Sequence, residues 1–123
     1  MHRPKIFQFF ALLWTVVITV LSLTTVSIGA IGSSIPIENK DKIVHFLFYF
    51  IFVLLWNLSQ HKKTTIKIIS ILIVAIFYGA IIEILQGFTA TRTADFFDFF
   101  ANTLGAVLGT LLCLNKPKKF KTN

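Results

Sequence analysis

Charged side chains are scarce in this chain. Only 14% of its 123 residues are charged and only five are acidic, whereas a soluble domain is usually about 25% charged. Hydrophobic residues instead make up 55% of the chain. A soluble fold of this size could not bury so much apolar surface, because a small domain leaves much of its area exposed. The composition therefore excludes an ordinary soluble domain and predicts that lipid covers the apolar surface.

Cysteine and the motifs of common enzyme classes are also nearly absent. Cys113 is the single cysteine, which excludes an internal disulfide and a Cys-x-x-Cys motif. The sequence has no Gly-x-Ser-x-Gly motif and no glycine loop of the kind that binds phosphates. One histidine and three carboxylates are a poor ligand set for zinc, although magnesium or manganese would tolerate it; we predict no bound metal and no cofactor. The side chains of that set are His45, Glu83, Asp95 and Asp98.

Four apolar runs dominate what the sequence does contain. A membrane-spanning helix needs about 20 mostly apolar residues. The first run exceeds the roughly 7–15-residue core of a secretory signal peptide, so we expect an uncleaved anchor. We predict an all-α integral membrane four-helix bundle that forms a single domain over residues 1–123. The predicted spans are residues 6–31, 43–60, 66–86 and 95–114.

The lysines and arginines are distributed unevenly around these runs. Cytoplasmic flanks of membrane proteins carry an excess of these residues. Nine of the twelve lie near the two termini and near the gap that contains His61, and the other three lie in the remaining gaps. We therefore predict a multi-pass protein with both termini in the cytoplasm. The net charge of +7 is explained by these flanks, so nucleic acid is not a predicted partner.

Polar side chains within the runs gather at the predicted outer ends. An ionisable group at the centre of a membrane helix costs about 2.5–3.5 kcal/mol, and such groups face a bundle interior or a wet cavity. Residues three or four positions apart share one face of a helix. We therefore predict that polar stripes meet at a binding pocket in the outer leaflet. Its residues are Asp41, Lys42, His45, Glu83, Gln86, Arg92, Asp95, Asp98 and Asn102.

Glycines continue two of these stripes. Gly79 lies one turn before Glu83, and Gly105 and Gly109 follow Asn102 along the last run. Small residues four positions apart allow a neighbouring membrane helix to approach closely. We predict that these glycines pack against other helices, although such spacing also arises by chance.

Three segments resemble the VanZ-like family: residues 41–45 (DKIVH), 83–86 (EILQ) and 92–105 (RTADFFDFFANTLG). The resemblance covers nearly the whole chain. It implies a bacterial cell-envelope protein of the cytoplasmic (inner) membrane, and the named family member is associated with low-level resistance to the glycopeptide teicoplanin. The resemblance also implies that the pocket residues, together with Gly105, are the motif residues of the family.

Two functions remain open for the predicted pocket. In the first, the chain is an accessory or binding module, and the pocket holds an envelope lipid, a lipid-linked precursor or a membrane protein partner. In the second, the chain is a membrane-embedded enzyme acting on such a lipid. His45 would then be a general base, and Glu83 or Asp98 would orient it or act as an acid. A transporter is disfavoured because no polar path continues into the cytoplasmic half. Polar contacts that only hold the bundle in register are the remaining alternative.

Overall fold

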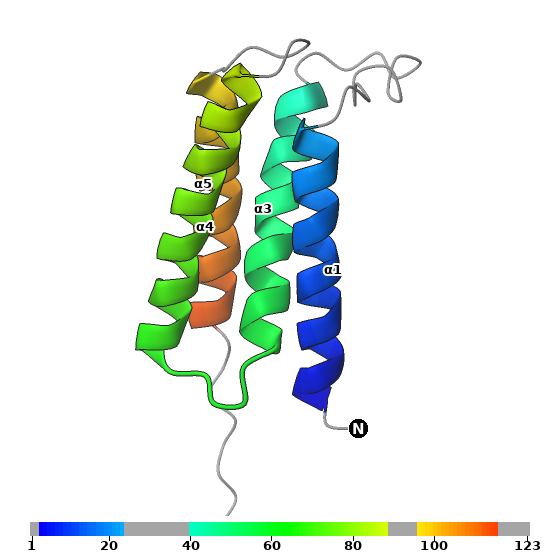
Figure 1. Cartoon of the computed structure of the whole chain (residues 1–123). Coiled ribbons are helices and arrows are strands. Elements are labelled where there is room, and N and C mark those ends of the chain that lie inside the picture. Colours follow the sequence, from blue (N-terminus) through cyan, green and yellow to red (C-terminus); the bar gives the residue numbers. More distant parts are fainter. Residues whose placement is uncertain (1–2, 24–39, 89–95, 116–123) are drawn as a thin grey trace, which may run out of the picture.

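The computed structural model of the chain describes residues 3–23, 40–88 and 96–115. Within these residues the chain forms helices and turns and no strand (Figure 1). The predicted fold class, an all-α membrane four-helix bundle, is confirmed. The helices are α1 (Arg3–Leu23), α3 (Lys40–Leu58), α4 (Thr65–Gly87) and α5 (Phe96–Leu114).

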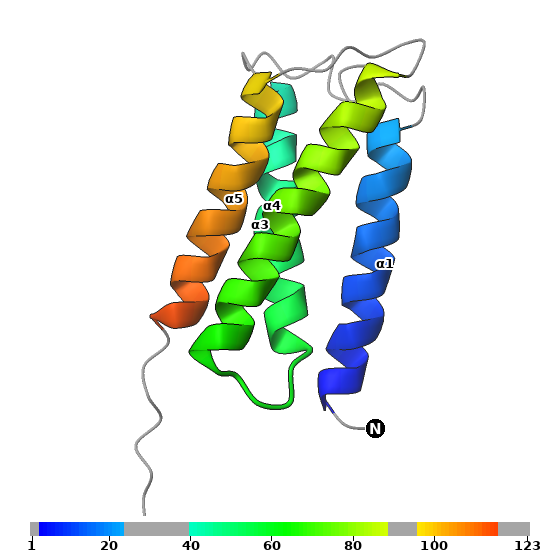
Figure 2. The ribbon, with the colours of Figure 1, turned by 60° about the vertical axis from the view of Figure 1, so that its left-hand side comes forward.

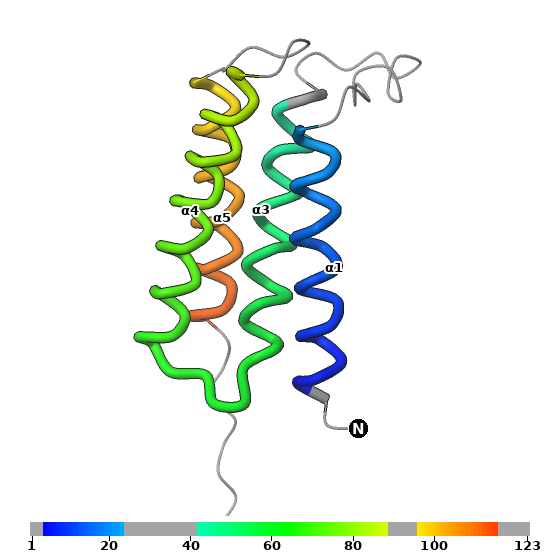
Figure 3. Tube along the Cα trace, in the orientation of Figure 1, coloured from blue at the N-terminus to red at the C-terminus, as the bar shows by residue number. Residues whose placement is uncertain are grey.

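The four helices alternate in direction along the chain. Helices α1 and α4 run one way, and α3 and α5 run the other way, so that α3 and α5 are parallel (Figure 3). One end of the bundle, here called the turn end, contains the start of α1, the turn 59–64 and the end of α5. The opposite end, called the polar end, contains the end of α1, the start of α3, the end of α4 and the start of α5. The described lysines Lys5, Lys62 and Lys63 therefore lie at the turn end.

Helix α3 is the centre of the bundle. It contacts the other three helices, and its interface with α5 is the most extensive. The large side chains on the outer surface are almost all apolar, as exposed Phe9, Val74, Phe77 and Leu104 illustrate. Such a surface suits a hydrocarbon solvent rather than water. The buried core lies mainly around α3 and consists of Ile18, Phe48, Tyr49, Phe52, Val53, Ala75 and Ala106.

Three of the helices are long and apolar enough to cross a membrane: α1 from Pro4, α4 and α5. The apolar part of α3 is shorter and covers Lys42–Leu58. Polar groups within a membrane are tolerated where they face other protein rather than lipid. Because α3 is packed against three helices, it can carry polar residues near both ends and still lie within the bundle.

Glycines set the close approach of α5 to α3. A methyl group added at Gly105 would overlap the carbonyl oxygen of Phe46 and lie 2.9 Å from its carbonyl carbon. One turn further on, a methyl group at Gly109 would lie 3.1 Å from the carbonyl oxygen of Phe50. The two contacts, Gly105 with Phe46 and Gly109 with Phe50, are four residues apart on both helices, as expected for parallel helices in fixed register. The contact between the two backbones brings polar side chains of α3 and α5 within reach of one another.

Both tryptophans form hydrogen bonds between helices, which we did not foresee from the sequence. The Trp14 Nε1–H of α1 donates to the Phe48 carbonyl oxygen at 2.9 Å. The Trp56 Nε1–H of α3 donates to Thr15 Oγ1 at 3.2 Å. The hydroxyl of Tyr78 in α4 donates to the carbonyl oxygen of Thr15 at 3.1 Å. These bonds join α1 to α3 and α4 where lipid offers no alternative partner.

Candidate functional site

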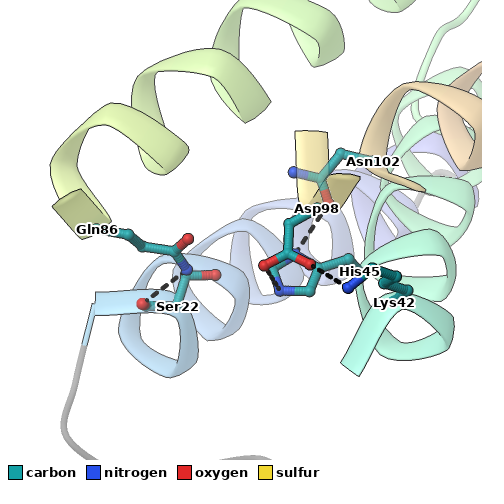
Figure 4. Close-up of polar contacts among 6 residues, drawn as sticks. All are labelled: Ser22, Lys42, His45, Gln86, Asp98 and Asn102. Atoms are coloured by element: carbon teal, nitrogen blue, oxygen red, sulfur yellow. Dashed lines mark hydrogen bonds and ion pairs between the residues drawn. The ribbon is translucent and has the colours of Figure 1, made fainter. Parts of the chain in front are cut away.

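Polar side chains from α3 and α5 meet at the polar end of the bundle. We call Lys42 and His45 of α3 and Asp98 and Asn102 of α5 the polar cluster (Figure 4). Each of the four lies within about 9 Å of the start of its helix, at a rise of 1.5 Å per residue. The cluster therefore lies in one half of the bundle, towards the polar end.

His45 is the most buried ionisable member of the polar cluster, with 3% of its surface exposed. Its Nδ1 lies 3.0 Å from the Oδ1 of Asn102. An amide oxygen only accepts hydrogen bonds, so Nδ1 carries the hydrogen and donates it. The Nε2 of the ring faces the Oδ2 of Asp98 at 3.8 Å, beyond hydrogen-bonding distance. Asn102 thus fixes the ring so that Nε2 is directed towards a carboxylate.

Lys42 connects this buried histidine to the membrane surface. Its Nζ lies 3.6 Å from the Oδ1 of Asp98, and 35% of the lysine side chain is exposed against 17% for Asp98. Exposure therefore increases in steps from His45 through Asp98 to Lys42. A molecule that approaches from the polar end would meet the lysine and the aspartate before the histidine.

Glu83 of α4 lies beside the polar cluster and is 7% exposed. It acts electrostatically on the phenol of Tyr49, which lies one helical turn after His45. A methyl group at Gly79, one turn before Glu83, would lie 3.3 Å from the Tyr49 ring and 3.5 Å from the Asn102 amide nitrogen. Helices α3, α4 and α5 therefore converge at this point, and Glu83 faces the same interior as the cluster.

Two buried hydrogen-bond donors near Gly79 have no partner among the described residues. They are the Tyr49 hydroxyl and the Asn102 Nδ2, and both side chains are at most 2% exposed. Buried polar groups are nearly always hydrogen-bonded, so each exception calls for an explanation. Both donors are therefore available to an acceptor that reaches them. We did not include Tyr49 among the binding residues predicted from the sequence, although its spacing of four from His45 was a usable sign.

Gln86 forms a separate contact beside the cluster. Its side-chain amide donates to the carbonyl oxygen of Ser22 at 3.0 Å and so joins α4 to the last turn of α1 (Figure 4). Both residues are buried, at 2% and 1% exposed. This bond ties helices together at the polar end, and the predicted binding role of Gln86 stays a prediction.

Three of the predicted binding side chains lie outside the described residues. Arg92 and Asp95 belong to the segment 89–95, and only the backbone of Asp41 is described, in the first turn of α3. Their roles stay predictions. Within the described ranges, no group of three or more metal-binding side chains lies together.

The turn-end half of the bundle also contains buried polar side chains, which we had not recognised in the sequence. Asn57 and Thr110 are each 2% exposed. Their side chains donate to carbonyl oxygens of their own helices, to Val53 and Ala106 respectively, at 2.8 Å. These local bonds satisfy the two donors without forming a continuous polar path, whereas the Oδ1 of Asn57 has no hydrogen-bond partner among the described residues.

Comparison with known proteins identifies the family. A family model described as VanZ/LLP1 matches residues 5–116. The chain belongs to the VanZ/LLP1 family. The resemblance inferred from the three sequence segments is therefore confirmed, and the matched range contains all four helices from residue 5 onward.

The chain is also similar to a protein of a eukaryote. An uncharacterized protein of the fission yeast Schizosaccharomyces pombe is 35% identical to the VanZ/LLP1 chain over 83 residues. The match covers 64% of the chain and 49% of the yeast protein, so the chain spans about half the length of this relative. No solved structure matches the chain. A yeast relative means that family membership alone does not establish a bacterial origin, which stays a prediction.

Proposed function

We propose that this VanZ/LLP1 protein is a binding or accessory module of the bacterial cell envelope. Its polar cluster would hold the headgroup of an envelope lipid or lipid-linked precursor, or a polar segment of a membrane protein partner. The proposal places the polar end at the outer leaflet and both termini in the cytoplasm, as the distribution of lysine and arginine predicts.

One observation carries this proposal: ionisable side chains from three helices converge at a single end of the bundle. A charged group costs about 2.5–3.5 kcal/mol at a helix centre and less towards the surface. A buried polar contact between membrane helices returns about 0.6 kcal/mol on average. The bond between His45 and Asn102 therefore offsets only part of the cost of placing His45, Glu83 and Asp98 within helices. A binding role explains why the remaining cost is tolerated.

The donors of the site suit a ligand with an anionic group and further hydrogen-bond acceptors, and the carboxylates of Glu83 and Asp98 suit hydroxyl or amino groups of the same ligand. Lys42 offers three donors at the exposed edge, and Asp98 holds its ammonium group near the entrance. Deeper in the bundle, the Tyr49 hydroxyl and the Asn102 amide supply donors. Phosphate and carbonyl oxygens can accept hydrogen bonds from Lys42 and from the two deeper donors. Arg92, which we predict to lie in the adjoining loop, would add a second cation.

Mass spectrometry of bound and total lipids tests the proposal. The purified chain and its Asp98→Asn variant would be compared for co-purifying amphiphiles, and total lipids would be compared between cells that lack and cells that overproduce the protein. We expect an amphiphile that is retained by the natural chain and reduced in the variant, with unchanged total lipids. Equal retention by both proteins, with no protein partner dependent on Asp98, would contradict the proposal.

A membrane-embedded enzyme is the second candidate, and the position of the His45 ring favours it. Because Nδ1 is held by Asn102, the neutral ring presents a basic Nε2 next to Asp98. A positioned general base typically contributes about 10²–10⁴ in rate. In this case the lipid comparison would reveal a new or missing envelope lipid that depends on His45. The same comparison therefore separates the enzyme from the module.

The link to glycopeptide resistance is a separate proposal that rests on family membership. Teicoplanin susceptibility would be measured in cells with and without the gene. A lower susceptibility that requires Asp98 would connect the polar cluster to the phenotype. Equal susceptibility would remove the resistance link and leave the binding proposal to the lipid measurement.

A further inference from the structure

A second candidate site lies in the other half of the bundle, towards the turn end. Helices α1 and α4 lie closer together at the polar end and diverge towards the turn end, as two views show (Figures 1 and 2). Between them, against α3, is a cavity of about 350 Å³. This volume falls within the range of about 300–1,000 Å³ that is usual for small-molecule sites. The residues that line it include Thr15, Phe52, Trp56, Ser70, Val74 and Tyr78.

The surface that faces this cavity is apolar, although several of its residues have polar atoms. The Trp56 Nε1–H and the Tyr78 hydroxyl both donate to Thr15. The Ser70 hydroxyl donates to the carbonyl oxygen of Ile66 in its own helix at 2.7 Å. The polar atoms are thus engaged within the protein. A cavity with apolar walls gives water no hydrogen-bond partners, so its suitable occupant is a hydrocarbon.

The depth of the cavity matches the lipid chains of one leaflet. Ser70 and Val74 follow the start of α4 at Thr65, and they lie about 8 and 14 Å from the turn end at 1.5 Å per residue. These depths fall within one half of a hydrocarbon core about 30 Å thick. Val74 is 58% exposed on the outer surface. The cavity therefore adjoins the region that acyl chains occupy.

A cation lies in line with the cavity at the membrane surface. Lys67, Ile71, Val74 and Tyr78 are spaced by four, three and four residues, which places them on one face of α4. The last three line the cavity, and Lys67 is exposed in the first turn of the helix. A headgroup above the cavity would therefore meet a positive charge, and an anionic lipid gains about fivefold in binding from one such lysine.

We propose that the cavity binds one acyl chain of an anionic phospholipid from the leaflet at the turn end, with the lipid headgroup at Lys67. This site is distinct from the polar cluster, which lies at the opposite end of the bundle. The two sites would be occupied by different molecules, and the lipid site does not depend on the proposed function of the cluster.

Trp56 lines the cavity and provides a direct probe, because bromine atoms on a lipid chain quench tryptophan fluorescence on contact. The Trp14→Phe variant leaves Trp56 as the single tryptophan. It would be reconstituted in phosphatidylcholine vesicles with a low mole fraction of either dibrominated phosphatidylglycerol or dibrominated phosphatidylcholine. We expect about fivefold preferential quenching by the anionic lipid, from the charge of Lys67. Equal quenching by the two lipids would overturn the proposal.

Matched substitutions assign that preference to the cavity. Val74→Phe fills part of it and excludes about two methylene groups of the chain, which corresponds to about tenfold weaker binding. Ile73→Phe introduces the same side chain at a neighbouring position that does not line the cavity and should leave the preference unchanged. Lys67→Gln should abolish the preference for the anionic lipid. A preference that survives Val74→Phe would place the lipid elsewhere and overturn the proposal.

A second measurement avoids the Trp14 substitution. Native mass spectrometry of the chain with both tryptophans would count the phosphatidylglycerol molecules that remain bound after delipidation. We expect one retained molecule that is lost in Val74→Phe and kept in Ile73→Phe. Equal retention by the two variants would contradict the cavity site, whatever the outcome of the fluorescence measurement.

Discussion

The Gly105→Ala substitution tests the helix contact that holds the polar cluster together. The added methyl group would overlap the carbonyl oxygen of Phe46, and backbone cannot rotate aside as a side chain can. Restoring an ordinary contact requires α3 and α5 to separate by about 1 Å. The bond between His45 and Asn102, 3.0 Å long, would then approach about 4 Å and be lost.

The expected cost of Gly105→Ala is about 2 kcal/mol of unfolding free energy. Overpacking costs about 1–3 kcal/mol, and the lost polar contact adds about 0.6 kcal/mol. The higher helix propensity of alanine returns about 1 kcal/mol. Unfolding in mixed micelles of a mild detergent and sodium dodecyl sulfate measures this difference.

Two other glycines provide graded controls for the same measurement. At Gly109 the methyl group would lie 3.1 Å from a backbone oxygen, so we expect an intermediate loss of stability. At Gly79 it would lie 3.3 Å from a side chain, the ring of Tyr49, rather than from backbone, and the higher helix propensity of alanine offsets this milder contact, so we expect a change near zero. If Gly105→Ala were as stable as Gly79→Ala, the close contact of α5 with the α3 backbone would be refuted.

Two further predictions concern the polar cluster and the neighbouring Glu83. His45→Ala should reduce the lipid retention or the phenotype that defines function. His61→Ala should not, because His61 lies exposed in the turn at the opposite end of the bundle. Equal effects of the two substitutions would remove His45 from the site. Glu83→Gln and Asp98→Asn keep the shape of each side chain and remove a carboxylate, so we expect a loss of function with nearly unchanged yield of folded protein in detergent. A parallel loss of folded protein, measured by size-exclusion chromatography, would show that these acids only hold the bundle together.

The fold was predictable from the sequence because apolar runs leave few alternatives in a membrane. In hydrocarbon every backbone polar group must be satisfied within the chain, which favours helices. The three helices that are long and apolar enough to cross a membrane, α1, α4 and α5, each fall on a predicted run. The central position of α3 was not predictable, because its short apolar stretch gives no sign of which helices surround it.

The candidate site was predictable as a set of residues but not as a set of contacts. Helical spacing and membrane depth pointed to His45, Glu83, Asp98 and Asn102, and the structure brings them to one end of the bundle. Spacing within one helix gives no information about partners on another. The pairing of His45 with Asn102 depends on the register of α3 against α5. That register is determined by the contacts of Gly105 and Gly109 in α5 with the backbone of α3.

Contacts made by large side chains were the least predictable part. Trp14 and Trp56 are typical of membrane-surface anchors by composition, yet both donate hydrogen bonds across helix interfaces. Gln86, which we predict to line the binding pocket, also bonds the backbone of α1. In each case the residue type allows both roles, and only the helix that lies opposite decides between them.

Labelling with a membrane-impermeant maleimide tests the central claim, that the polar cluster lies beneath the outer face of the membrane. Single cysteines would be introduced as Gly87→Cys at the polar end and His61→Cys at the turn end, in a Cys113→Ala background. Our account predicts that in intact cells the reagent labels the cysteine at position 87, and that it labels the one at position 61 only after the membrane is permeabilised. Labelling of position 61 with protection of position 87 would place the polar cluster on the cytoplasmic side and contradict the account.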